Sequence, residues 1–269
     1  MIVFLFWNLF YYRSYKSYRT SKTYTNCMNQ FEFTTSEEKK TYVRKMFSDI
    51  SRRYDFLNHF LSFGLDYYWR RKAVKIVKAN IAAIESPNIL DIACGTGDLS
   101  FEILKQIPNA QITGIDLAEP MLEIFRKKAH ENKAEVIIEE GDVEAMRFAD
   151  NSFDAVMIGF GTRNFTRLDI AFTEINRVLK PNGIFVNLEL TEPRIFPVKQ
   201  LNRFYSRIIL PAIGKLFSKN KEAYTYLPDS IARFPKRDVI LKILLKAGFP
   251  EAHWKDLSAG IVTMHIARK

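Results

Sequence analysis

The sequence of 269 residues contains only two cysteines, Cys27 and Cys94, and four histidines. Two cysteines cannot build a disulfide framework or a cysteine-rich metal cluster, so we predict no metal site. A reducing, cytoplasmic setting is the simplest interpretation. Acidic residues are also scarce relative to basic ones, and the net charge is +10. Such a charge suits an anionic membrane face, a nucleic acid or an acidic ligand equally well, so it does not choose a partner.

The first 30 residues differ from the rest of the chain. The apolar run over residues 1–12 is shorter than the roughly 20 residues that span a bilayer, and no basic segment precedes it as in a signal peptide. Four cations and no acid follow it up to Cys27, and without them the net charge falls to +6. A shallow membrane anchor is one interpretation. We favour the alternative that residues 1–27 are translated upstream DNA and that Met28 is the start, and we expect residues 1–30 to be poorly ordered.

Residues 31–269 are predicted to form one α/β domain. A helical front piece, 36–85, opens with the capping box Thr35-Ser36-Glu37-Glu38, and we expect helices in it over about 36–48, 55–62 and 67–83. Short apolar runs then alternate with helical stretches, and this alternation predicts βαβ units and a mostly parallel, Rossmann-like sheet covered on both faces. A helical insertion, 192–235, with a helical stretch over 196–217, interrupts the alternation, and two closing strands bring the expected number to seven. The predicted strands are 88–93, 111–115, 134–139, 153–158, 184–190, 253–257 and 261–267.

Polar and glycine residues follow three successive strands. Gly95 and Gly97 form a G-x-G turn after the first strand, without the third glycine of a dinucleotide fingerprint. Asp98 at the following helix N-terminus would repel a pyrophosphate, which argues against NAD. An acid at Asp116 can accept hydrogen bonds from ribose hydroxyls, and Asp142 can accept from an adenine amino group while the Val143 N–H donates to the ring. Each residue alone could be a turn or cap residue, but together they predict an adenosyl ligand that carries a sulfonium and an amino acid.

Three further stretches resemble the UbiE/MenG quinone-biosynthesis methyltransferases. They are Tyr54-Asp55-Phe56-Leu57-Asn58 with Leu61-Ser62 and Trp69, then Phe160-Gly161-Thr162-Arg163-Asn164, then Arg177-Val178-Leu179-Lys180-Pro181-Asn182-Gly183 leading to residues 188–193. The resemblance covers about residues 36–269. Three places depart from the family pattern. Asp66 stands where a histidine is usual, Gly159 stands where some members have a serine that contacts the cofactor, and Leu190-Thr191 stands where Phe-Ser is more frequent.

The resemblance implies a class I methyltransferase fold and S-adenosylmethionine as methyl donor. It implies C-methylation of demethylmenaquinol or of a ubiquinol precursor. The cofactor residues that carry over are Thr96, Asp116, Asp142 and Val143, beside Gly95, Gly97 and Gly159 of the same strand ends. The catalytic candidates are Arg163, which could stabilise a phenolate, and Tyr54, which could hydrogen-bond the quinol oxygen. A structural ion pair for Arg163 and simple aromatic packing for Tyr54 stay open as alternatives.

The implied substrate resides in a bilayer, so we expect contact with the inner face of the membrane. The insertion carries a row of apolar residues that could form a slot for the isoprenoid tail, or could be ordinary amphipathic packing: Phe196, Leu201, Phe204, Tyr205, Ile208, Ile209 and Leu210. No added module or strong basic stripe predicts a nucleic-acid partner. A benzoquinol substrate, another small-molecule methyltransferase, a non-catalytic adenosyl-binding protein and a homodimer all stay open. The absence of a transit pattern favours a bacterial menaquinone enzyme.

Overall fold

The structure is a computed structural model, and it describes residues 31, 33–209 and 222–269. The chain divides into two compact units, Met1–Thr34 and Thr35–Lys269. The expectations for residues 1–30, and for the part of the insertion from residue 210 to 221, therefore lie outside the described residues. Within the described ranges, no helix is both long enough and apolar enough to cross a bilayer.

A seven-stranded sheet forms the centre of the second unit, as the alternation of strands and helices predicts. The strand order is β3-β2-β1-β4-β5-β7-β6. The first five strands are parallel, and β7 runs antiparallel to both β5 and β6. Strands β1, β2 and β3 follow one another outward on one side and β4 begins the other side, so the order reverses between β1 and β4, where α/β sheets form a ligand crevice at the carboxyl ends of the strands. The strands are β1 (Asn88–Ile92), β2 (Gln111–Asp116), β3 (Val136–Glu140), β4 (Phe153–Gly159), β5 (Leu179–Leu190), β6 (Glu251–Leu257) and β7 (Val262–Arg268).

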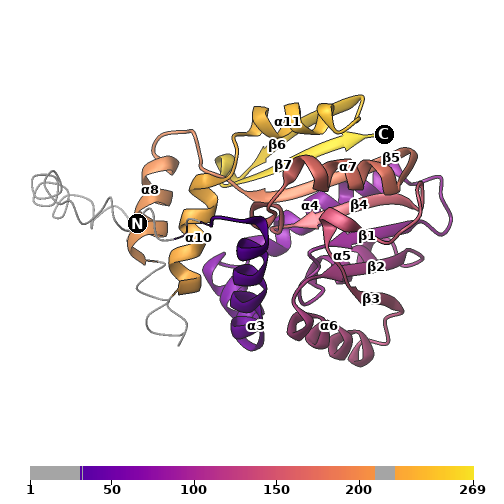
Figure 1. Cartoon of the computed structure of the whole chain (residues 1–269), viewed down its shortest axis with the longest axis horizontal. Helices are drawn as coiled ribbons and strands as arrows, with labels where there is room; N and C mark the ends of the chain where they lie inside the picture. Colours follow the sequence, from indigo (N-terminus) through magenta and orange to yellow (C-terminus); the bar gives the residue numbers. More distant parts are fainter. Residues whose placement is uncertain (1–30, 32, 210–221) are drawn as a thin grey trace, which may run out of the picture. The chain divides into compact units, whose positions relative to one another are not determined.

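Helices cover both faces of this sheet (Figure 1). Successive strand residues point to opposite faces, so Ile89 packs with one apolar cluster and Leu90 with the other. Val74 and Ile103 belong to the first cluster, and Phe172 belongs to the second. The helices are α3 (Ser36–Leu61), α4 (Leu65–Asn80), α5 (Asp98–Gln106), α6 (Glu119–Glu131), α7 (Leu168–Val178), α8 (Val198–Phe204), α10 (Glu222–Arg233) and α11 (Arg237–Lys246).

The front piece begins as the capping box predicts, with the Thr35 hydroxyl accepting from the Glu38 N–H at 3.1 Å. The predicted helices 36–48 and 55–62 are one helix, α3, of 26 residues. No glycine or proline lies between its ends, so nothing in the chain stops the helix earlier. Phe63 and Gly64 then adopt positive φ angles of 53° and 73° and turn the chain into α4.

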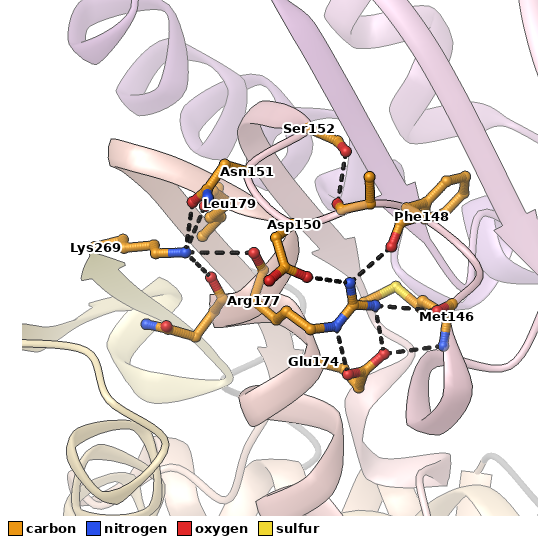
Figure 2. Close-up of polar contacts among 11 residues, drawn as sticks. Met146, Phe148, Asp150, Asn151, Ser152, Glu174, Arg177, Leu179 and Lys269 are labelled. Atoms are coloured by element: carbon orange, nitrogen blue, oxygen red, sulfur yellow. Dashed lines mark hydrogen bonds and ion pairs between the residues drawn. The ribbon is translucent and has the colours of Figure 1, made fainter.

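Arg177, the first residue of the recurrent Arg-Val-Leu-Lys-Pro-x-Gly stretch, is a structural residue. Its guanidinium donates to the carbonyl oxygens of Phe148 and Met146 and pairs with Glu174 and Asp150 (Figure 2). The Lys269 ammonium caps the carboxyl end of α7, the helix that contains Arg177, by donating to backbone oxygens, in keeping with the partial negative charge there. These contacts hold α7 to the loop before β4, at the amino end of that strand and opposite the crevice.

The insertion is less regular than predicted. A single helix is expected over 196–217, but the described part consists of α8 and a π-helical turn, Tyr205–Ile209. A second helix, α10, follows residue 221, and Pro228 lies inside it. The chain is thus helical from Val198 to Ile209, as predicted for this part of the stretch, and the difference is the change to π-helical geometry at Tyr205.

Candidate active site

The turn between β1 and α5 depends on two glycines with left-handed backbone. Gly95 has φ +54° and Gly97 has φ +88°. A Cβ atom at Gly97 would overlap the ring of Phe125, which is fully buried in α6. The small residues thus let the turn pack directly onto α6 while the Gly95 side of the turn stays open, since nothing lies within 4 Å of a Cβ there. Cys94 is buried beside this turn, and burial raises the pKa of its thiol well above the ordinary value, as expected for a packing residue.

A first cavity lies at the carboxyl ends of β1, β2, β3 and β4, with about 750 Å³ of empty space that is partly open to solvent. Helix α3 covers it through Lys40, Val43, Phe47 and Tyr54. Five residues predicted for the cofactor line it, namely Gly95, Asp116, Asp142, Val143 and Gly159. The other two, Thr96 and Gly97, belong to the turn but do not line the cavity.

Asp116 ends β2 and points its carboxylate at the glycine turn. One oxygen accepts from the Gly95 N–H at 3.0 Å, and the other accepts from the Ala118 N–H at 2.9 Å. Burial raises the pKa of this carboxyl, although the backbone donors of Ala118, Gly95 and Leu117 oppose the rise. Each carboxylate oxygen can accept more than one hydrogen bond, so Asp116 retains capacity for hydroxyl donors in the cavity.

Lys40 is a member of the cavity wall that no motif in the sequence singles out. Its ammonium lies 2.6 Å from an Asp142 oxygen and 2.9 Å from a Glu144 oxygen. Burial opposes ionisation of Glu144, but hydrogen bonds from Thr166 and Lys40 lower the pKa of its carboxyl overall. The second Asp142 oxygen accepts from the Glu144 N–H. Lys40 therefore ties α3 to the end of β3 and orients Asp142 at the cavity.

Thr96 links the turn to the front piece rather than to the cavity. Its hydroxyl donates to an Asp55 oxygen at 2.5 Å, and the other Asp55 oxygen lies 2.7 Å from the Lys128 ammonium. Lys128 also pairs with Asp98 at 2.9 Å. The pKa of Lys128 is lowered by burial but raised more by Asp98 and Asp55. Asp55 of α3, the turn and α6 are thus joined by one set of charges.

Asp66, which stands where the family usually has a histidine, belongs to a neighbouring network of charged side chains. Its carboxylate accepts from the Ser62 hydroxyl at 2.6 Å, lies 2.7 Å from His59 Nδ1 and pairs with Arg70. Arg70 also reaches Asp98 at 3.4 Å. Ligand atoms of His59, Asp66 and Asp98 lie within 4.8 Å of one another, a spacing that can suit a metal ion. The Arg70 guanidinium pairs with both carboxylates, so a positive charge of the protein itself already offsets the negative charge of this cluster.

A second cavity, with about 1200 Å³ of empty space, adjoins the first. Tyr54 and Phe160 line both cavities. Helices α3, α4, α8 and α10 and the end of β5 enclose the second cavity, and its wall is mixed. Leu61, Trp69, Leu190, Leu227, Ile231 and Ile261 supply apolar surface, and Asn58, Asp66, Arg70 and Arg163 supply polar groups.

Glu189 is the buried ion-pair partner of Arg163. Arg163 Nη1 lies 2.8 Å from Glu189 Oε1, and the Arg163 backbone N–H donates to Glu189 Oε2 at 3.0 Å. The same Nη1 donates to the Phe160 carbonyl oxygen. Burial lowers the pKa of Arg163, but Glu189 and Tyr54 raise it overall, so the group stays cationic. The Nε atom is buried without a hydrogen-bond partner among the described residues. Arg163 therefore is both ion-paired and a wall residue of the second cavity.

Tyr54 stands where the cavities meet. Its ring packs edge-on against Phe47 at 5.7 Å, and its hydroxyl hydrogen-bonds the Asn58 side chain. Burial raises the pKa of the phenol, and the nearby Arg163 charge offsets part of the rise. The phenol is consequently neutral at neutral pH and can donate a hydrogen bond.

Most of the apolar residues predicted to form a tail slot are exposed and do not line a cavity. Phe196, Leu201 and Phe204 are exposed and do not line either cavity, with Phe204 54% exposed. Only Tyr205 of that predicted group lines the second cavity, and its hydroxyl donates to the Leu61 carbonyl oxygen at 2.7 Å. The side chains at 207 and 208 and residue 210 lie outside the described part of the chain.

Known proteins resemble this chain over nearly all of its described length. Residues 34–269 match the model of the ubiE/COQ5 methyltransferase family. The demethylmenaquinone methyltransferase of Bacteroides fragilis is 38% identical over 239 residues, which cover 88% of this chain and 96% of that protein. The ubiquinone/menaquinone biosynthesis C-methyltransferase UbiE of Geotalea daltonii is 42% identical over 237 residues, covering 86% and 98%. The crystal structure of the [4+2]-cyclase SpnF matches 74% of this chain and 80% of its own with a TM-score of 0.56 and 20% identity, a likeness of fold alone.

Proposed function

The chain belongs to the ubiE/COQ5 methyltransferase family, and on this premise we propose that it methylates a ring carbon of a reduced isoprenoid quinone precursor. The methyl donor is S-adenosylmethionine, and the proposed substrate is demethylmenaquinol, which becomes menaquinol. Relatives that match nearly their whole length carry the name demethylmenaquinone methyltransferase, and this supports the choice of the naphthoquinol. A benzoquinol is the second candidate, because other relatives are named for both ubiquinone and menaquinone biosynthesis.

The first cavity has the chemistry that an adenosyl group requires. Asp116 and Asp142 would accept from the ribose hydroxyls and the adenine amino group, and Val143 would border the ring. The open space beside Gly95 would admit the amino-acid end of the ligand close to the backbone. When bound, S-adenosylmethionine supplies an electrophilic methyl group on a sulfonium. Thr96 and Gly97 would act indirectly, by holding the turn in place.

The second cavity would hold the quinol ring. A ring carbon becomes a strong nucleophile when a neighbouring phenol loses or shares its proton. Arg163 is buried, cationic and short of one hydrogen-bond acceptor, so a phenolate oxygen would complete its set of partners. Preorganised donors of this kind typically contribute a factor of about 10²–10³ to the rate. Glu189 would keep the guanidinium in position.

Tyr54 would align the two ligands. It lines both cavities, and its neutral hydroxyl can donate to a quinol oxygen. Methyl transfer needs the accepting carbon in line with the bond that breaks, so orientation carries much of the catalysis. The observation that carries the proposal is therefore the junction of the two cavities at Tyr54 and Phe160, with Arg163 in the wall of the second.

Because the proposed substrate carries an isoprenoid tail, we also propose that the protein works in the cytoplasm at the inner face of the membrane. The apolar wall formed by Leu61, Leu190 and Leu227 supports tail binding inside the second cavity. A homodimer stays a prediction.

The test is a methyl-transfer assay with labelled S-adenosylmethionine. Demethylmenaquinol, its oxidised quinone and a demethoxy-benzoquinol are offered separately to the full chain. We expect label in the reduced naphthoquinol and none in the oxidised quinone, since oxidation removes the electron-rich ring. Measurable binding of S-adenosylmethionine without transfer to any quinol would favour another small-molecule methyltransferase or a non-catalytic adenosyl-binding protein.

A further inference from the structure

The corner between α3 and α4 exposes an unusual number of large apolar side chains. We define this corner patch as Phe56, Phe60, Phe63, Leu65, Tyr67 and Tyr68, and each is at least 43% exposed. Phe63, at the corner itself, is 80% exposed. The Phe56 and Phe60 rings stack at 5.9 Å, and the six residues lie at the adjoining ends of α3 and α4 and in the turn between them, so they give this corner an exposed apolar surface of the kind that marks an interaction site.

The exposed charges of the segment that carries the corner patch have one sign. Between residues 51 and 80, all of which the structure describes, every exposed charged side chain is basic. The two acids in this stretch, Asp55 and Asp66, are engaged with Lys128 and Arg70 instead. The exposed cations are Arg52, Arg53, Arg71, Lys72, Lys75 and Lys78.

Apolar and basic residues follow one another along the same helix face. Leu65, Tyr68, Lys72 and Lys75 are spaced three, four and three residues apart, so they form one stripe on α4. The Lys72 ammonium lies 5.4 Å from the Tyr68 ring centroid, which confirms that the apolar and basic parts touch. With a rise of about 1.5 Å per residue, Lys72 is roughly 10 Å along the axis from Leu65. That distance matches a helix end whose apolar part enters a bilayer about 5–10 Å deep while cations remain at headgroup level.

The inner side of the same corner is part of the second cavity. Leu61, Ser62 and Asp66 line that cavity, and the Phe63 ring lies 6.1 Å from the ring of Tyr205, another wall residue. One corner thus presents its inner surface to the substrate cavity and its outer surface to the surroundings. A tail that leaves the cavity beside this corner would meet a membrane bound to its outer surface.

We propose that the corner patch docks this protein onto an anionic lipid bilayer, with the aromatic corner inserted between lipids and the α4 lysines against headgroup phosphates. The proposal rests on the proposed function, because a lipid-borne quinol is what makes docking at the cavity useful. Charge complementarity favours a lipid surface over a second copy of this chain, since two copies would bring cations against cations.

The test is sedimentation of the full chain with vesicles of phosphatidylcholine, with and without phosphatidylglycerol. We expect binding to the phosphatidylglycerol vesicles that weakens as salt is raised. The double variant Leu65→Gln/Tyr68→Gln should weaken partitioning by roughly tenfold or more, as loss of buried apolar surface requires. Lys72→Gln/Lys75→Gln should weaken it by roughly tenfold or more on anionic vesicles only. The matched control is Val239→Gln/Leu245→Gln, which removes similarly exposed apolar residues from α11 and should leave binding unchanged.

Three results would overturn the proposal. One is absence of wild-type binding to anionic vesicles, and another is equal binding by Leu65→Gln/Tyr68→Gln and wild type. The third is that Leu65→Gln/Tyr68→Gln leaves vesicle binding unchanged but changes the oligomeric state, measured by light scattering. That result would make the patch an interface between copies of this chain. Methylation of a short-tailed quinol in solution is measured alongside and should be equal in variant and wild type. If wild type fails to methylate it, the proposed function fails, while the vesicle comparison still judges the docking surface.

Discussion

Replacing Asp91 by asparagine should change how the stability of the protein depends on pH. Asp91 lies in β1 with no exposed surface, and one of its oxygens accepts from the Ser100 hydroxyl at 2.6 Å. The other oxygen has no partner among the described residues. Burial raises the pKa of this carboxyl from 3.8 to about 7. Between those values the folded protein holds a proton that the unfolded chain releases, so the free energy of unfolding falls as pH rises through this window.

The magnitude follows from the shift in pKa. Between pH 5 and pH 8 the free energy of unfolding falls over the roughly two pH units that lie below the raised pKa, which corresponds to about 3 kcal/mol. The substituted asparagine would be neutral throughout and would keep an acceptor for Ser100, so Asp91→Asn should gain about 3 kcal/mol relative to wild type between about pH 5 and pH 8. Any cost of the new amide N–H is the same at both pH values and cancels.

Urea unfolding at pH 5 and pH 8 measures this difference directly, and thermal unfolding should show a relative change of about 10 °C. The control is Asp169→Asn on the surface of α7. A hydrogen bond from Arg167 lowers the pKa of Asp169 below its ordinary value, so this carboxyl is ionised at both pH values in the folded and the unfolded chain. The stability of the control variant relative to wild type should therefore be the same at pH 5 and pH 8. An Asp91→Asn variant that behaved like this control would show that folded Asp91 does not hold its proton.

Four other substitutions test the site. Gly97→Ala should destabilise the protein by about 3 kcal/mol in thermal unfolding, because the new Cβ overlaps a ring of α6 at a left-handed position; an unchanged Tm would contradict the packing of the turn. Asp116→Asn should weaken S-adenosylmethionine binding by about tenfold or more in calorimetry, through loss of a charged acceptor. Glu189→Gln should lower stability by about 3 kcal/mol and lower kcat more than it changes KM for either substrate, because the Arg163 charge loses its buried partner; a normal kcat would separate Glu189 from catalysis. Phe204→Asp should leave the ratio of long-tailed to short-tailed kcat/KM in detergent within roughly a factor of two, since the side chain is exposed.

The strand and helix pattern could be predicted because its signals are local. Alternation of apolar runs with helical stretches is sufficient for the seven-stranded sheet, and the capping box correctly places the start of α3. The bounds of the insertion could not be predicted in the same way. Its helix α8 has seven residues and exposes Leu201 and Phe204, so its apolar pattern does not report a buried face. These two side chains therefore do not line the second cavity, and the tail slot predicted from that pattern stays a prediction.

The sequence predicts which residues lie at the strand ends, but it does not predict which distant side chains contact them. Asp116 and Asp142 follow strands, and parallel strands bring their carboxyl ends together. Lys40 reaches Asp142 from 102 positions away, and no spacing rule encodes that contact. Glu189 could have been recognised from the sequence, because an acid next to the last residue of the mostly apolar stretch 184–190 needs a cationic partner once it is buried. That need could have identified the partner of Arg163.

The position of the transferred methyl group distinguishes methylation of a ring carbon from methylation of a phenolic oxygen. The full chain is incubated with S-adenosylmethionine labelled with ¹³C in its methyl group and with chemically reduced demethylmenaquinol, and the product is examined by NMR. We predict a new ¹³C signal from a methyl group on the quinol ring carbon, lost when Arg163 is replaced by methionine. A methyl ether on a phenolic oxygen would contradict C-methylation, and an equal yield from the Arg163→Met variant would contradict the role of Arg163.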